Sequence, residues 1–217
     1  MAGTGSKVSR DRDNHQGKWR IISAYCIWFV SQHLFLVIYL VILENLTSGL
    51  TKPCVMDIKP GRITWPPEAS RERIASQSSK CTGTKIPFGF GVQGMVLHTD
   101  LGLKRIDKKF GNALDATTVH KVLEIFLGNR NVNSISLAKS FLKKLKDLEK
   151  FFESQTAFHN FGCSMLFLYD LGEPDTAQVR LIDFVHALPG NGKIDEGFLF
   201  GLKNVRSLFD DYVDGNY

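Results

Sequence analysis

The sequence predicts an α+β fold in which mainly antiparallel strands pack with three or four helices. Ser164–Asp170 and Gln178–His186 are rich in β-branched and aromatic residues, and the turn-forming stretch LGEPDTA separates them. That pattern is typical of a β-hairpin. Between Ile135 and Phe152, Leu and Phe recur at helical spacing with lysines around them, which predicts a strongly amphipathic helix. The alternating stretch Phe88–His98 and the hairpin-like return after it add further antiparallel strands.

The first twenty residues are polar and basic without an apolar period, and we expect them to be disordered. The apolar run Ile21–Leu43 follows, with Arg20 before it and Glu44 after it. It is long enough to span a bilayer, with the basic flank inside. However, its second half, Leu34–Leu43, is β-branched and aromatic like a buried strand. Both interpretations stay open at this point.

The middle of the chain begins with a polar connector, Glu44–Thr51, and a predicted strand, Cys54–Lys59. The stretch GRITWPPEAS predicts a loop that ends at Ser70, a candidate N-cap. A helix is expected from there to about Lys80. Further along, the period of apolar residues predicts two more helices: Asp115–Phe126, and a C-terminal helix that begins at about Glu196 or Gly197.

Composition limits the class of protein without identifying it. The chain has 217 residues, of which 43% are hydrophobic, enough for one sizeable core or one full lobe plus a small one. The net charge of +5 fits an anionic partner but does not select one. Four cysteines stand far apart without a CxxC pair, which argues against a zinc site or a disulfide scaffold and for a reducing compartment.

A glycine-rich stretch, GFGVQGMV at Gly89–Val96, matches the nucleotide-binding patterns GxGxxG and GxGxxGxV. The glycines lie inside an alternating strand pattern, and no helix follows as a dinucleotide site requires. No HRD or DFG motif of a protein kinase occurs downstream. We therefore expect strand glycines that permit close packing.

Two motifs carry charges at strand positions. In PCVMDIKPG, Asp57 and Lys59 lie two residues apart on one predicted strand, so their side chains project to the same face. In LIDFVH, Asp183 stands at the end of a predicted strand, where a carboxylate suits a hard cation such as magnesium. Taken singly, each motif is also compatible with a strand-edge ion pair or an exposed carboxylate.

Together, these motifs resemble the inositol polyphosphate kinase family. Pro53, Asp57, Lys59 and Gly61 fill the family signature PxxxDxKxG. Downstream, CSMLF resembles its SSLL element, IDFVH resembles its IDF element, and IDEGFLFGLKNV is similar to its C-terminal segment. The resemblance runs from about residue 36 to residue 208. It implies a reduced relative of the protein kinase fold, with ATP and Mg²⁺ as cofactors.

The resemblance also implies roles for individual residues. Backbone groups of Glu44 and Leu46 in the hinge ILENL would contact adenine, and Asp57 would bind the ribose hydroxyls. Lys59 would meet both the phosphoryl group in transfer and the attacking hydroxyl. Asp183 would hold magnesium, and Ser164 would support the metal and phosphate end. The inositol phosphates would be bound by Arg73, Lys80 and Lys108, and also by His186.

Within the family, TWPPEAS followed by RERI resembles the multikinases, and the hexakisphosphate kinases are the alternative because SSKCTGTK resembles their pattern. The trisphosphate 3-kinases fit less well, because they carry a larger insert after PxxxDxKxG. We expect a monomer of the cytoplasm or nucleus that binds inositol polyphosphates and ATP and no nucleic acid. A membrane anchor through residues 21–43 is the alternative location.

The resemblance predicts three parts of the chain. Residues 1–33 look unrelated to the family, residues 34–51 form the last N-lobe strand and the hinge, and residues 52–217 form the C-lobe. A short helical insert for inositol lies at about 66–82. The N-lobe is therefore incomplete in this prediction, and no match exists for its phosphate-contacting Lys. The alternative function is a catalytically impaired, truncated inositol-phosphate-binding protein.

Overall fold

The computed structural model describes residues 20–31, 34–78 and 83–216, and between residues 20 and 43 it describes the backbone alone. The chain divides into two compact units, residues 1–50 and 51–217. The division falls beside the expected boundary between residues 51 and 52. The assignment of these parts to kinase lobes stays a prediction.

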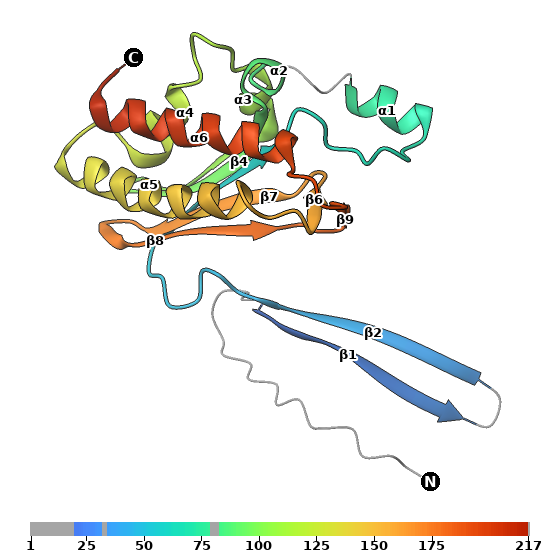
Figure 1. Ribbon diagram of the computed structural model, residues 1–217. Helices are drawn as coiled ribbons and strands as arrows, with labels where there is room; N and C mark the ends of the chain where they lie inside the picture. The colour runs from blue at the N-terminus through green and yellow to red at the C-terminus, as the bar shows by residue number, and fades with distance from the viewer. Residues whose placement is uncertain (1–19, 32–33, 79–82, 217) are drawn as a thin grey trace. The chain divides into compact units, whose positions relative to one another are not determined.

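The first unit contains an antiparallel pair of strands, β1 (Arg20–Ser31) and β2 (Leu34–Glu44) (Figure 1). The long apolar run therefore folds as two strands, and the strand expected at Leu34–Leu43 coincides with β2. Among the described residues, no helix is both long and apolar enough to cross a membrane. The segment expected to be disordered, residues 1–20, lies outside the described residues except for Arg20.

The second unit is built on a five-stranded antiparallel sheet with the strand order β5-β4-β3-β7-β8. Its strands are β3 (Pro53–Pro60), β4 (Phe90–Thr99), β5 (Gly102–Ile106), β7 (Ser164–Asp170) and β8 (Glu173–Ile182). A separate pair, β6 (Phe158–Asn160) and β9 (Ala187–Pro189), is also antiparallel. The predicted α+β class with antiparallel strands is confirmed.

Six helices lie among the described residues, two more than the expected maximum of four. They are α1 (Arg71–Ser78), α2 (Lys85–Phe88), α3 (Lys108–Ala113), α4 (Lys121–Leu127), α5 (Val132–Phe152) and α6 (Glu196–Asp214). The short helices α2 and α3 have too few residues to show an apolar period in the sequence. Helix α5 begins three residues before the predicted start, because Asn131 and Ser134 form a capping box there.

The central strand, β3, places its side chains on two different faces of the sheet. Cys54, Met56 and Ile58 are buried in the core. Helices α5 and α6 cover one face of the sheet (Figure 1). Phe141 of α5 packs against Phe167 of β7 and Phe209 of α6, with ring centroids 5.5 and 5.6 Å away. The alternate residues of β3, among them Asp57 and Lys59, therefore project from the face opposite the helical layer.

The glycine-rich stretch forms strand β4, as expected, rather than a nucleotide-binding loop. A Cβ atom at Gly94 would lie 2.9 Å from the carbonyl oxygen of Ile106 on the neighbouring strand β5. Gly89 lies at a left-handed φ of 65° just before the strand. These glycines permit close packing, so the interpretation from the sequence is confirmed.

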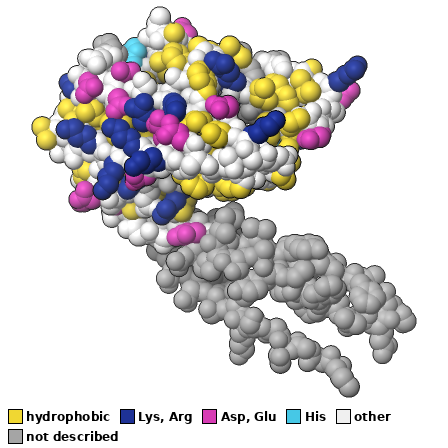
Figure 2. Space-filling model, in the orientation of Figure 1, with side chains coloured by type: hydrophobic (Ala, Val, Ile, Leu, Met, Phe, Trp, Pro, Cys, Tyr) yellow, Lys and Arg dark blue, Asp and Glu magenta, His cyan; other side chains and the backbone are white. Residues whose placement is uncertain are grey.

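The outer surface of α5 and α6 mixes charges of both signs (Figure 2). Lys143, Lys144 and Lys146 of α5 are exposed. Glu149 of the same helix accepts an ion pair at 2.7 Å from Arg206 of α6. This face is therefore a solvated surface with ion pairs between the two helices.

Candidate active site

The ammonium group of Lys59 joins three elements of the second unit. Its Nζ donates to Oδ2 of Asp183 at 2.9 Å and to the carbonyl oxygen of Gly162 at 2.7 Å. Lys59 lies near the end of β3, Gly162 lies just before β7, and Asp183 follows β8 directly. Two of the three charged residues that the motifs singled out, Lys59 and Asp183, are thus in direct contact.

Asp183 owes its orientation to an unusual backbone conformation. Strand β8 starts five residues earlier than predicted and ends at Ile182, so Asp183 lies beyond the sheet. Its φ is +66°, a left-handed value that Asp and Asn tolerate better than other residues with a Cβ atom. The turn directs its carboxylate towards Lys59 and leaves the side chain about half exposed, at 48%.

Gly162 takes a left-handed conformation on the other side of Lys59, with a φ of +77°. A Cβ atom there would lie 3.2 Å from the backbone oxygen of Thr64. A glycine is therefore favoured at this position, and its carbonyl group points at the ammonium. Sequence reasoning missed Gly162, because a backbone acceptor leaves no side-chain signal.

Asp57 occupies the same face of β3, two residues before Lys59. Burial raises the pKa of its carboxyl group, while a hydrogen bond with Ser164 and the charge of Lys59 act in the opposite direction. Ser164 itself is buried at the start of β7, the strand that neighbours β3. Oδ1 of Asp57 is buried and has no hydrogen-bond partner in the part of the chain that the structure describes. That oxygen is available to accept a hydrogen bond from a ligand.

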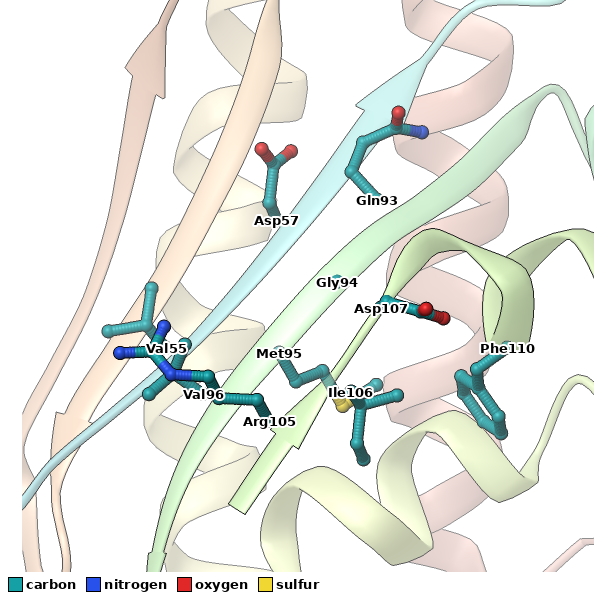
Figure 3. Close-up of a pocket in the computed structure, with 10 residues that line it drawn as sticks. All are labelled: Val55, Asp57, Gln93, Gly94, Met95, Val96, Arg105, Ile106, Asp107 and Phe110. Atoms are coloured by element: carbon teal, nitrogen blue, oxygen red, sulfur yellow. The ribbon is translucent and has the colours of Figure 1, made fainter. Parts of the chain in front are cut away.

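A pocket of about 800 Å³ opens on this face of the sheet, beside Asp57 (Figure 3). Three strands and the start of α3 contribute to its walls. The lining residues are Val55, Asp57, Gln93, Gly94, Met95, Val96, Arg105, Ile106, Asp107 and Phe110. The sequence analysis named only Asp57 among them as a site residue, because it assigned the glycine-rich stretch that contains Gln93 and Gly94 to strand packing.

The residues predicted to bind the inositol phosphates lie on several different elements. Nη2 of Arg73 in α1 lies 2.6 Å from Nε2 of His186, so these two predicted residues are in contact. Lys108 begins α3, close enough for its charge to lower the pKa of Asp57. Lys80 lies outside the described residues.

The predicted adenine-binding residues belong to the other unit. Glu44 ends β2, and Leu46 lies in the turn that follows it. Both precede the boundary after Leu50. Their nucleotide contacts stay a prediction.

The carboxylate of Asp183, beside Lys59, suits a metal ion that is also bound by the phosphate oxygens of a ligand. Among the described residues, no three His, Cys, Asp or Glu side chains form a cluster that could hold a metal by themselves. Asp183 offers one half-exposed carboxylate. Magnesium commonly binds through one or two carboxylates and completes its shell with phosphate oxygens and water, so Asp183 fits such an ion.

Comparison with known proteins identifies inositol polyphosphate kinases as the relatives of this chain. The family model described as "Inositol polyphosphate kinase" matches residues 40–210. The chain is 35% identical over 186 residues to inositol polyphosphate multikinase alpha of Arabidopsis thaliana, a match that covers 75% of this chain and 65% of that protein. It is 28% identical over 211 residues to inositol hexakisphosphate kinase 3 of Mus musculus, with 85% and 52% covered. The chain thus spans less than two thirds of the length of these relatives.

Solved structures show the same likeness. A chain from a study of an inositol phosphate multikinase superposes with a TM-score of 0.70 at 30% identity, covering 86% of this chain and 88% of that one. The inositol phosphate multikinase of S. cerevisiae, solved with ADP and Mn²⁺, superposes with a TM-score of 0.76 at 21% identity, covering 90% and 89%. The latter likeness, at 21% identity, shows the fold alone.

Proposed function

Because the chain belongs to the inositol polyphosphate kinase family, we propose that it transfers a phosphoryl group from ATP to a hydroxyl group of an inositol polyphosphate, in the manner of a multikinase. The observation that carries this proposal is the contact between Lys59 and Asp183, next to the pocket that Asp57 lines. These are the charged residues of the two signature motifs, and the fold brings them to one face of the sheet.

Phosphoryl transfer needs little covalent help from a protein, because it depends mainly on positioning and on neutralising negative charge. Lys59 supplies a positive charge that a carbonyl oxygen and a carboxylate hold in place. A fixed cation is more effective than a mobile one, because it requires no reorganisation when charge develops. Lys59 would therefore contact the phosphoryl group in transfer and the attacking hydroxyl group.

Three further side chains would bind the nucleotide end. The half-exposed carboxylate of Asp183 would hold Mg²⁺, which supplies additional positive charge to the phosphate oxygens, and Ser164 would support that end. Oδ1 of Asp57, which has no partner among the described residues, would accept a hydrogen bond from a ribose hydroxyl. Glu44 and Leu46 would contact adenine through their backbone groups.

A separate set of basic side chains would bind the inositol phosphates. Arg73 and His186 are already in contact, and Lys108 lies at the start of α3. Lys80 would join them. A substrate with several phosphates requires several cations at fixed spacing, and short helices and strand ends hold such side chains in place.

Two alternatives differ in substrate or in activity. The hexakisphosphate kinases are also similar to the chain, at 28% identity. A protein that binds inositol phosphates without transferring phosphate is the other alternative, because the sequence has no match for the phosphate-contacting Lys of the family's N-lobe.

The test is to incubate the purified chain with Mg²⁺, ATP and inositol tris-, tetrakis- and hexakisphosphates. Lys59→Ala should lower kcat by about 100-fold or more, as loss of a positioned charge does. Lys121→Ala, which removes an exposed lysine of α4, should leave kcat unchanged. Transfer by Lys59→Ala at the wild-type rate would refute the role of Lys59, and binding without any transfer would favour the non-catalytic alternative.

The location and the oligomeric state are further parts of the proposal. We expect a monomer of the cytoplasm or nucleus, and a membrane anchor through residues 21–43 is the alternative. Carbonate extraction of membranes separates these locations, because an anchored chain stays in the pellet. Light scattering of the purified chain would measure the oligomeric state.

A further inference from the structure

The pocket beside Asp57 contains a cation that no signature motif identifies. Arg105 lies on the edge strand β5, is exposed, and lines the pocket. It makes no ion pair or hydrogen bond with any residue that the structure describes. An arginine next to a pocket, with its donors unused, is suited to bind an anionic group of a ligand.

The register of the strands aligns Arg105 with the floor of the pocket. Val55 of β3 pairs with Val96 of β4, and Val96 pairs with Arg105 of β5. In Figure 3, the side chain of Arg105 extends from β5 across β4 towards Val55. Its guanidinium group therefore lies over the open face of the sheet, on the same side as Asp57.

The space between Asp57 and Arg105 is kept open by a glycine. Asp57 pairs with Gly94 of β4, in the row next to that of Arg105. Since Gly94 has no side chain, nothing stands on the floor of the pocket at that position. Two strand spacings across and two residues along the strand separate the Cα atoms of Asp57 and Arg105 by about 12 Å. This open space leaves room for a ligand of the size of an inositol polyphosphate beside Arg105.

The position of Arg105 relative to β3 indicates whether it would bind a phosphate of ATP or a phosphate of the inositol polyphosphate. Ser164 and Asp183, which would support the metal and the phosphates of ATP, lie on β7 and at the end of β8. Apart from Val55 and Asp57 of β3, the pocket is lined by β4, β5 and the start of α3, on the opposite side of β3. The phosphate donor and the acceptor must approach Lys59 from different sides, because attacking and leaving oxygens are roughly in line.

We infer that Arg105 binds a phosphate group of the inositol polyphosphate substrate, on the side of the pocket away from the metal. This inference rests on the proposed function. The planar guanidinium group would contact two oxygens of one phosphate, which a lysine at the same position could not do with the same geometry.

The test compares Arg105→Gln with Lys104→Gln. Lys104 is the preceding residue of β5, is exposed and does not line the pocket, so its loss removes the same charge from the same strand. Arg105→Gln should raise KM for the inositol polyphosphate about tenfold or more, whereas KM for ATP and kcat should change little. Arg105→Lys should be intermediate. Lys104→Gln should match the wild type.

Direct binding separates failure of the inference from failure of the proposed function. Calorimetric titration with inositol hexakisphosphate, without nucleotide, should show weaker binding to Arg105→Gln than to the wild type. Equal binding and equal KM in both variants would overturn the role of Arg105. A rise in KM for ATP alone would assign the phosphate to the nucleotide and would also overturn it. A wild-type chain that neither binds nor phosphorylates any inositol phosphate would refute the proposed function itself.

Discussion

The carboxyl group of Asp57 lowers the stability of the folded chain when it is ionised, and it leaves one oxygen open to a ligand. This group is largely buried, and burial raises its pKa above the ordinary value of 3.8. The folded chain therefore binds the proton of Asp57 more tightly than the unfolded chain does. Stability should fall as pH rises from 3.8 to the raised pKa, and the loss is complete above that window.

Asp57→Asn removes this charge and should therefore raise the urea midpoint near neutral pH, with little effect at pH values below 3.8, where the carboxyl group is protonated in both states. The same variant should bind nucleotide more weakly. Asp175→Asn, which changes an exposed carboxylate of β8, is the control and should leave the midpoint unchanged. A neutral-pH midpoint for Asp57→Asn at or below that of the wild type would contradict the expectation.

Gly162 permits a second test at the scale of one residue. Ala at a left-handed φ costs about 1 kcal/mol, and at Gly162 the added Cβ atom would also press on Thr64. The carbonyl group that holds Lys59 would then shift, so kcat should fall about tenfold while the KM values change little. Gly172→Ala is the matched control, because Gly172 has a φ of +91° and nothing within 4 Å of its Cβ position. Equal kcat values in the two variants would show that Gly162 does not position Lys59.

At the scale of helices and strands, apolar periodicity predicted the long elements well. The spacing of Leu and Phe predicted α5, and the paired strand patterns predicted β7 and part of β8. The start of α4 was placed six residues too early, at Asp115 instead of Lys121. The side chain of Asp115 binds the backbone N–H groups of Thr117 and Thr118, which forms a turn rather than a helical start.

The motifs with charged side chains named residues that the fold brings together, while their roles stay predictions. The signature motifs identified Asp57, Lys59 and Asp183, which lie together. Gly162 and Arg105 were missed, because a backbone carbonyl group and a lone arginine on an edge strand follow no spacing rule. Their proximity depends on strand register over long sequence separations, and local periodicity does not specify that register.

The contact of α6 with the end of β3 allows a test of element packing. A Cβ atom at Gly201 of α6 would lie only 2.1 Å from the oxygen of Gly89 and 2.7 Å from the nitrogen of Gly61. Both contacts are with backbone atoms, so the helix itself would have to move. Gly201→Ala should therefore lower the free energy of unfolding by about 3 kcal/mol, as measured by urea denaturation.

Gly197, in the first turn of the same helix, is the control for that measurement. Its Cβ position has one neighbour, Oδ1 of Asp195 at 3.7 Å, and φ is not positive. Gly197→Ala should be neutral or stabilising by up to about 1 kcal/mol. If both variants lost stability equally, the cause would be a general effect on the helix rather than the close approach of α6 to Gly89.

At the scale of the whole molecule, the division into two units predicts that removing the first unit weakens binding of ATP but not binding of inositol phosphates. The described hydrophobic core extends from Cys54 to Tyr212, entirely within residues 51–217. The charged residues Asp57, Lys59 and Asp183 also lie within that unit, whereas Glu44 and Leu46 do not. A fragment of residues 51–217 should therefore fold cooperatively and retain its affinity for inositol hexakisphosphate, while its affinity for ATP should fall about tenfold or more through loss of the adenine contacts.

Calorimetric titration of the fragment and the full chain with each ligand would measure both affinities. Unchanged ATP affinity in the fragment would show that Glu44 and Leu46 are not the adenine contacts, and loss of affinity for inositol phosphate in a folded fragment would place part of that site in residues 1–50.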